Sequence, residues 1–315
     1  MSIAQGGQSS AAPIPDALNI GLLIVACAAA ALCLRVASHA ESWWIAIAAA
    51  VVFSYVNNTI FSLMHEAVHG VFNADRRLNE AGGRIAAAFF PTAFALQRVF
   101  HEAHHANNRS EVERFDYYSP NENRPLKFLQ WYCILTGLYW LGPPIFSAVY
   151  ALTAGLIDWK GLASRGSGFA RQTAADEFLE SLGRVSVLRA RLDSALAFVL
   201  QASLFYGLGL SLAGWLLCYA CFAVSWSSLQ YADHAFSALD RVEGAWNLRF
   251  NPMARVMFLN YNLHLNHHRS PATPWLHLPM LTRAEDEARS FWAVYLAMWR
   301  GPRPLPAGKN SGLEA

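Results

Sequence analysis

The sequence predicts an all-α integral membrane protein with about four transmembrane helices in two hairpins and a cytoplasmic helical cap that carries clustered histidines. Three observations support this fold class. Of 315 residues, 54% are hydrophobic and only 15% are charged, whereas about a quarter of an average soluble domain is charged. Several apolar blocks approach or exceed the roughly 20 residues that span a bilayer. Eight of the 11 histidines fall into three short clusters.

The two chain ends are expected to lie outside a single membrane domain that covers residues 17–300. Residues 1–16 are small and polar, and we expect them to be disordered. They contain no Lys or Arg, so the basic region of a secretory signal is missing, and the apolar run that follows is expected to remain in the mature protein. Residues 301–315 are rich in Pro and Gly and are expected to form a flexible tail.

Four apolar blocks define the predicted membrane segments. Residues 17–38 and 43–64 are separated by a few residues and form a first hairpin. The block 195–231 has nearly the roughly 40 residues that two tilted short spans need, with Gly207, Gly209 and Gly214 as candidate turn residues. The block 128–157 is broken by Gly142-Pro143-Pro144. It is either a shallow membrane-embedded hairpin or one full span.

The distribution of basic residues predicts which side of the membrane the loops occupy. Lys and Arg accumulate in cytoplasmic loops, and of the 24 in the chain only Arg35 lies near the turn of the first hairpin. Placing the loop from Lys160 to Arg191 inside puts the other 23 on the cytoplasmic side. The histidine clusters, which follow the first hairpin, are therefore predicted to be cytoplasmic.

Composition also argues against several other classes of protein. The net charge of +2 is small for a nucleic-acid-binding protein. All five cysteines lie in apolar stretches, where a thiol behaves as a small hydrophobe, so no disulfide framework is expected. Cys218 and Cys221 form a CxxC without a partner cluster, which is a weak metal or redox signal. No flavin or nicotinamide fingerprint is present.

The histidine clusters read HEAVH, HEAHH and HLNHH. Residues three and four apart share one face of a helix, so each cluster directs its imidazoles the same way, as metal binding requires. Histidines outside the clusters, such as His39 and His277, are interpreted as hydrogen-bonding residues. Eight imidazoles exceed the needs of one zinc ion, which takes three or four protein ligands, and suit two metal ions. The eight are His65, His69, His101, His104, His105, His264, His267 and His268.

Ligand type alone leaves the metal open, because imidazole suits iron, zinc and copper. A two-iron, oxygen-activating centre makes chemical sense beside lipid, since breaking an unactivated C–H bond demands a strong oxidant. HEAVH and HEAHH also fit the H-E-x-x-H motif of zinc proteases. An intramembrane zinc protease remains a remote alternative, because residues 195–232 supply no acidic third ligand. A non-catalytic metal-binding or lipid-binding membrane protein is a further alternative.

Together with HLNHHRSPATPWLHLP, the three boxes resemble the HxxxH, HxxHH and HxxHH boxes of the membrane fatty acid desaturase superfamily, which also contains alkane and carotenoid-ring hydroxylases. The resemblance covers roughly residues 43–279. It implies a cytoplasmic cap that holds two iron ions and a channel for a lipid chain. It also implies that His234, in QYADHAF, is a ninth metal ligand beside the eight box histidines. The candidates for residues that support the ligands are Glu66, Glu102, Asp116, Asn262 and Asn266.

The resemblance implies an O₂-dependent diiron desaturase that introduces a double bond into a fatty-acyl or lipid chain. A diiron membrane hydroxylase of a lipid, alkane or ring substrate is the alternative, because geometry alone decides the outcome after the first hydrogen is removed. The third box begins with His264 rather than the Gln of front-end desaturases, and no cytochrome-b5-like heme motif is present. Electrons are therefore expected from a separate donor, such as ferredoxin or a similar small carrier.

Overall fold

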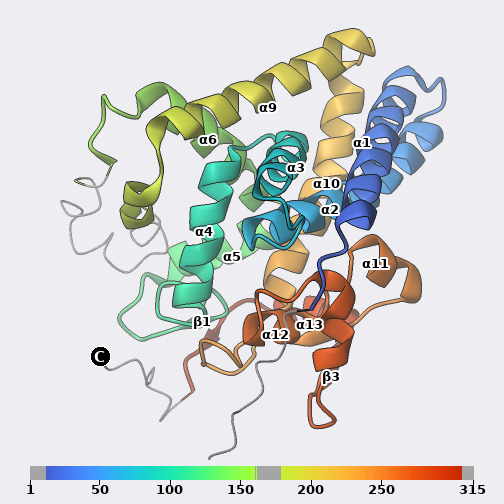
Figure 1. Ribbon diagram of the computed structural model, residues 1–315. Helices are drawn as coiled ribbons and strands as arrows, with labels where there is room; N and C mark the ends of the chain where they lie inside the picture. Colours follow the sequence, from blue (N-terminus) through green and yellow to red (C-terminus); the bar gives the residue numbers. More distant parts are fainter. Residues whose placement is uncertain (1–11, 160, 162–178, 307–315) are drawn as a thin grey trace, which may run out of the picture.

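The protein is mostly helical (Figure 1). Its structure is a computed structural model that describes residues 12–159, 161 and 179–306. Three of its helices are long and apolar enough to cross a membrane: α1 (Asp16–His39), α2 (Trp43–Val68) and α10 (Leu212–Ala232). The first two form the hairpin predicted over residues 17–38 and 43–64. All three pack against one another. Most of the basic loop from Lys160 to Arg191 lies outside the described residues.

The block predicted as a second hairpin contains two helices, α9 (Val187–Gly207) and α10. Gly209 in the turn between them has a φ of +59°, which glycine adopts without a steric penalty. α9 begins earlier than predicted and is not among the candidate spans, because charged residues in its first turns make it too polar. In Figure 1 it runs obliquely across α3 and α6, and it packs against both helices.

The segment predicted over residues 128–157 is a broken element. It consists of α5 (Arg124–Leu135), a short 3-10 turn η1 (Leu138–Leu141) and α6 (Gly142–Thr153), with a bend of 88° between the two halves. If the bent pair counts as one span, the described part of the chain has four candidate spans, and otherwise it has three. The predicted membrane protein with about four spans is therefore confirmed within this range.

The helices and short strands outside the spans build the cap. They comprise α3 (Arg76–Phe89), α4 (Phe94–Asn107), η2 (Leu182–Arg184), α11 (Pro252–Met257), α12 (His264–Arg269), η3 (Trp275–Leu281) and α13 (Phe291–Met298). Two parallel pairs join β1 (Tyr117–Tyr118) to β4 (Arg303–Pro304) and β2 (Asn247–Arg249) to β3 (Ala288–Ser290). In Figure 1, α11, α12 and α13 gather at one end of the helix bundle.

The β1–β4 pair lies partly in the segment that we predicted to be a flexible tail. The backbone N–H of Arg303 donates to the Asp116 carbonyl oxygen at 2.8 Å, and that of Leu305 donates to the Tyr118 carbonyl oxygen at 2.9 Å. Ordered structure therefore extends past the predicted boundary at residue 300, at least through Leu305.

Polar contacts fix α2 against α10 inside the bundle. Ser54 Oγ lies 2.5 Å from Ser225 Oγ, and Asn58 Nδ2 donates to Ser225 Oγ at 3.0 Å. Hydrogen bonds of this kind stabilise helix packing in a membrane, where apolar surfaces gain little from leaving lipid. These contacts help to set the position of the C-terminal end of α2, which carries the first histidine cluster.

Candidate metal centre

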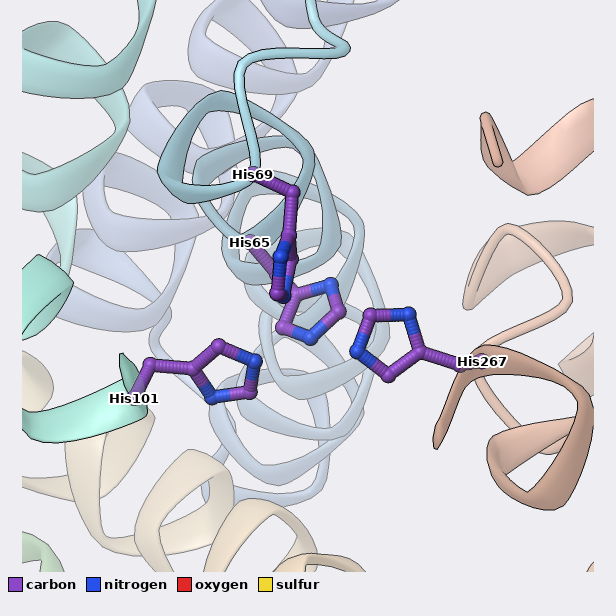
Figure 2. Close-up of side chains that lie close together, drawn as sticks. All are labelled: His65, His69, His101 and His267. Atoms are coloured by element: carbon purple, nitrogen blue, oxygen red, sulfur yellow. The ribbon is translucent and has the colours of Figure 1, made fainter. Parts of the chain in front are cut away.

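Two groups of four histidines converge in the cap, and in each group the ligand nitrogens lie within 4.8 Å of one another. Figure 2 shows the first group, in which the imidazoles point toward one another from three helices. Neutral imidazole nitrogens in this arrangement suit a metal ion. The first group is His65, His69, His101 and His267, and the second is His104, His234, His264 and His268.

The groups do not follow the sequence clusters. α2 contributes only to the first group, and His234, just after α10, only to the second. α4 and α12 contribute to both, because His101 and His104 are divided between the groups, as are His267 and His268. Side chains three residues apart, and even neighbouring ones, thus belong to different groups, which the shared-face prediction did not anticipate.

His105 lies between the two groups. Its Nε2 is 2.9 Å from His101 Nε2 and 3.0 Å from His267 Nε2, and its ring centroid is 4.5 Å from that of His268. Metal–imidazole bonds of about 2.0–2.1 Å place two ligands at right angles about 3 Å apart. The short nitrogen separations around His105 therefore fit ligands that share one metal ion.

Several imidazole nitrogens are buried without a hydrogen-bond partner in the described part of the chain. They are Nε2 of His65, His69 and His234 and Nδ1 of His264, and buried polar groups are seldom left unpaired in this way. Burial, together with the neighbouring imidazoles, lowers the pKa of His105 to about 2 and the pKa values of His101 and His267 well below the usual value. The rings are therefore neutral at pH 7 and can offer lone pairs, so the residues fit two metal ions.

The remaining ring nitrogen of several ligands faces an acceptor, which is how proteins orient metal-binding histidines. His234 Nδ1 lies 2.8 Å from the Gly244 carbonyl oxygen. His104 Nδ1 lies 3.3 Å from Glu113 Oε2. These contacts favour the proton on Nδ1 and leave Nε2 for the metal.

Asp233 is an acidic partner that the sequence analysis missed. Its Oδ2 lies 3.6 Å from His264 Nδ1 and its Oδ1 lies 3.9 Å from His234 Nε2. The carboxylate is buried, and both of its oxygens lack hydrogen-bond partners among the described residues. Burial raises the pKa of Asp233 well above its usual range, so its carboxyl group would be ionised at this site only beside a bound cation. Its place directly before His234 was the available sequence signal.

The five predicted supporting residues lie around the site, but none hydrogen-bonds a histidine ring within the described residues. Glu66 Oε2 accepts from the backbone N–H of Trp275 at 2.9 Å. The Glu102 side chain is 47% exposed, and its Oε2 lies 3.5 Å from Arg184 Nη1. Both glutamates thus bind groups other than histidine.

The other three predicted supporting residues stabilise the frame of the cap. Asp116 binds Arg109 through two hydrogen bonds of 2.7 and 2.8 Å, and both side chains are buried. Asn262 Nδ2 donates to the Leu248 carbonyl oxygen at 2.7 Å. Asn266 Nδ2 donates to the Leu278 carbonyl oxygen at 2.9 Å, which joins α12 to η3.

The two H-E-x-x-H segments therefore do not form separate zinc sites. His65 and His69 share their group with histidines from α4 and α12, and the histidines of HEAHH are divided between the groups. A zinc protease would instead combine its two motif histidines with one further ligand and an open position. The histidine-only donor sets favour a two-metal centre.

This fold and site define a class of protein, a multi-pass helical membrane protein with two histidine groups that are each able to hold a metal ion. The comparison with protein families is more specific, because the fatty acid desaturase model matches residues 41–300. The chain belongs to the fatty acid desaturase family, a family of diiron oxidoreductases. No curated protein matches the chain.

Proposed function

We propose that the protein is an O₂-dependent desaturase that introduces a double bond into a fatty-acyl or lipid chain. The observation that carries the proposal is the pair of four-histidine groups with His105 between them. In this proposal, nine histidines hold two iron ions: the eight of the two groups and His105. Iron bound there would activate O₂ into an oxidant strong enough for an unactivated C–H bond.

The overall reaction balances with an external supply of electrons. A saturated –CH₂–CH₂– unit loses two hydrogens, and O₂ takes these with two further electrons and two protons to form two waters. The electrons come from a separate donor, such as ferredoxin or a similar small carrier. The chain's own residues orient His234 through Gly244 and His104 through Glu113, and they bury most of the histidine side chains.

A small cavity beside both histidine groups supports this proposal. It has room for about one water molecule, which also suits a molecule as small as O₂. It is bounded by His65 and His267 of the first group, by His264 of the second, and by Tyr261 and Trp275. A small reactant there would contact ligands of both metal positions.

Metal and product analyses test the proposal together. Purified protein is expected to contain close to two irons per chain, and one zinc without iron would contradict the assignment. The product is expected to lack two hydrogens relative to the substrate, as measured by mass spectrometry of lipids from cells with and without the protein. A product that gains one oxygen would instead identify the hydroxylase alternative.

Histidine variants add a matched comparison. His104→Ala and His267→Ala, one from each group, are expected to abolish activity and to reduce bound iron. His277→Ala is the control, because His277 lies outside both groups and its Nε2 contacts the Pro13 carbonyl oxygen at 3.0 Å. Full activity in either of the first two variants would refute the two-metal assignment.

A further inference from the structure

A basic hollow lies between α3 and α9, separate from the histidine groups. Four arginines and one glutamate line it, and its volume is about 420 Å³, within the range of about 300–1,000 Å³ typical of ligand sites. No step of the proposed desaturation uses these residues. The lining residues are Arg76, Arg77, Glu80, Arg84 and Arg189.

The acidic residues around this hollow are partly engaged, and among the described residues Glu80 Oε2 is buried without a hydrogen-bond partner. Glu80 Oε1 lies 2.6 Å from Arg98 Nη2, and Asp193 Oδ1 lies 2.9 Å from Arg84 Nε. The Asp75 carboxylate accepts the backbone N–H groups of residues 77 and 78 at the start of α3, which occupies that helix end.

Three guanidinium groups are left without such partners. Arg76, Arg77 and Arg189 are exposed, and within the described residues their side chains make no hydrogen bond or ion pair, although the charge of Arg189 acts on Asp193. Guanidinium groups match the oxygens of a phosphate in pairs. The hollow is therefore equipped for a phosphate-bearing anion.

Exposed aliphatic residues on the same two helices indicate where the hollow lies relative to the membrane. Leu188 and Leu192 on α9 are 67% and 60% exposed, and Leu78 and Ile85 on α3 are also exposed. An arginine side chain is costly in the hydrocarbon core of a membrane, whereas an exposed leucine side chain is favoured there. On α3 and α9 the arginines and the exposed aliphatic residues lie within a few residues of each other. The hollow is therefore placed at the level of the lipid headgroups, between the hydrocarbon core and water.

We propose that this hollow binds the phosphate of an anionic phospholipid, with the acyl chains along Leu188 and Leu192 of α9. Basic pockets between membrane helices are known to bind such headgroups. The shared chemistry is a phosphate group, which a free phosphate compound could also supply. A lipid bound there would bridge α3 and α9 through arginines from both helices.

Lipid retention in native mass spectrometry tests the proposal. The full-length, metal-loaded protein is delipidated in detergent and mixed with equal amounts of phosphatidylglycerol and phosphatidylcholine. Wild type is expected to retain phosphatidylglycerol selectively. The double variant Arg76→Gln, Arg77→Gln is expected to lose this selectivity by roughly ten- to thirty-fold. The control Arg283→Gln, Arg300→Gln removes two exposed arginines elsewhere and is expected to keep it.

Three further results would overturn the proposal. Equal retention of both lipids by wild type would exclude a site for an anionic headgroup. Displacement of phosphatidylglycerol by an equimolar amount of inorganic phosphate would identify a free phosphate compound as the ligand. The double variant Arg76→Gln, Arg77→Gln could instead keep the lipid selectivity of wild type and lose turnover only when an acidic electron-carrier protein is the donor. That result would identify the hollow as a protein docking site.

Discussion

At the scale of single residues, Asp233 tests whether an acidic side chain beside the histidine groups supports metal binding. Asp233→Asn keeps the side chain's size but removes a carboxyl group that a bound cation would hold ionised beside His234 and His264. Loss of such a ligand-supporting group lowers metal affinity by about 10–100-fold. Iron bound at limiting iron concentration is expected to fall by that order, as measured by a chelator competition titration.

The control for this prediction is Glu285→Gln, which removes an exposed negative charge outside the histidine groups. It is expected to bind iron as wild type does. Equal iron affinity in both variants would mean that Asp233 has no part in metal binding.

A Glu66→Gln variant distinguishes the desaturase interpretation of HEAVH from the protease interpretation, in which this glutamate is the general base. A glutamine at this position can still accept the backbone N–H of Trp275, so Glu66→Gln is expected to keep two irons and most of the activity. The cost to stability is expected to be about 1 kcal/mol, that of a weakened hydrogen bond. Complete inactivation with full iron content would instead indicate that the carboxylate itself takes part in catalysis.

At the scale of elements, the sequence predicts the first hairpin and the three histidine helices well, because apolar length and the three-four spacing are local signals. It did not predict how histidines are divided between the groups. That division depends on how α4 and α12 face each other, and only tertiary packing sets this. The oblique course of α9 also escaped prediction, since its apolar second half resembles a span.

Gly137 tests the bend between α5 and α6. Its φ is +83°, and a Cβ there would lie 2.7 Å from the backbone nitrogen of Val224 on α10. Gly137→Ala is therefore expected to destabilise the protein by about 1–3 kcal/mol through strain and overpacking. Thermal unfolding in detergent micelles measures the loss.

Gly142→Ala is the matched control in the same segment. A Cβ at residue 142 has no atom within 4 Å, and its backbone φ is −56°. Its melting temperature is expected to stay close to that of wild type. A similar drop in both variants would show that the segment is sensitive to any added side chain, whatever the backbone conformation.

At the scale of the whole molecule, we propose that the cap with the histidines lies on the cytoplasmic side of the membrane, and this orientation can be tested. Glu41 lies in the turn of the first hairpin, and Glu285 lies in the loop before β3; both are exposed. A membrane-impermeant maleimide applied to intact cells is expected to label Glu41→Cys. It is expected to label Glu285→Cys only after the cells are permeabilised.

The wild-type chain is the control for this labelling, because none of its five free cysteines is exposed. Labelling of Glu285→Cys in intact cells, with Glu41→Cys protected, would place the histidines on the outer side and reverse the orientation inferred from the basic residues.

The division of neighbouring histidines between the groups has a consequence for the spacing of the two metals. His267 and His268 are consecutive residues of one short helix, yet they belong to opposite groups. α12 therefore links the two groups within a single helical turn, while α2, α4 and His234 supply their other members. A tilt of α12 would move His267 of the first group together with His264 and His268 of the second, so the distance between two bound metal ions is expected to change little with bilayer thickness. X-ray absorption spectra of the iron-loaded protein in thin and thick bilayers would reveal any change.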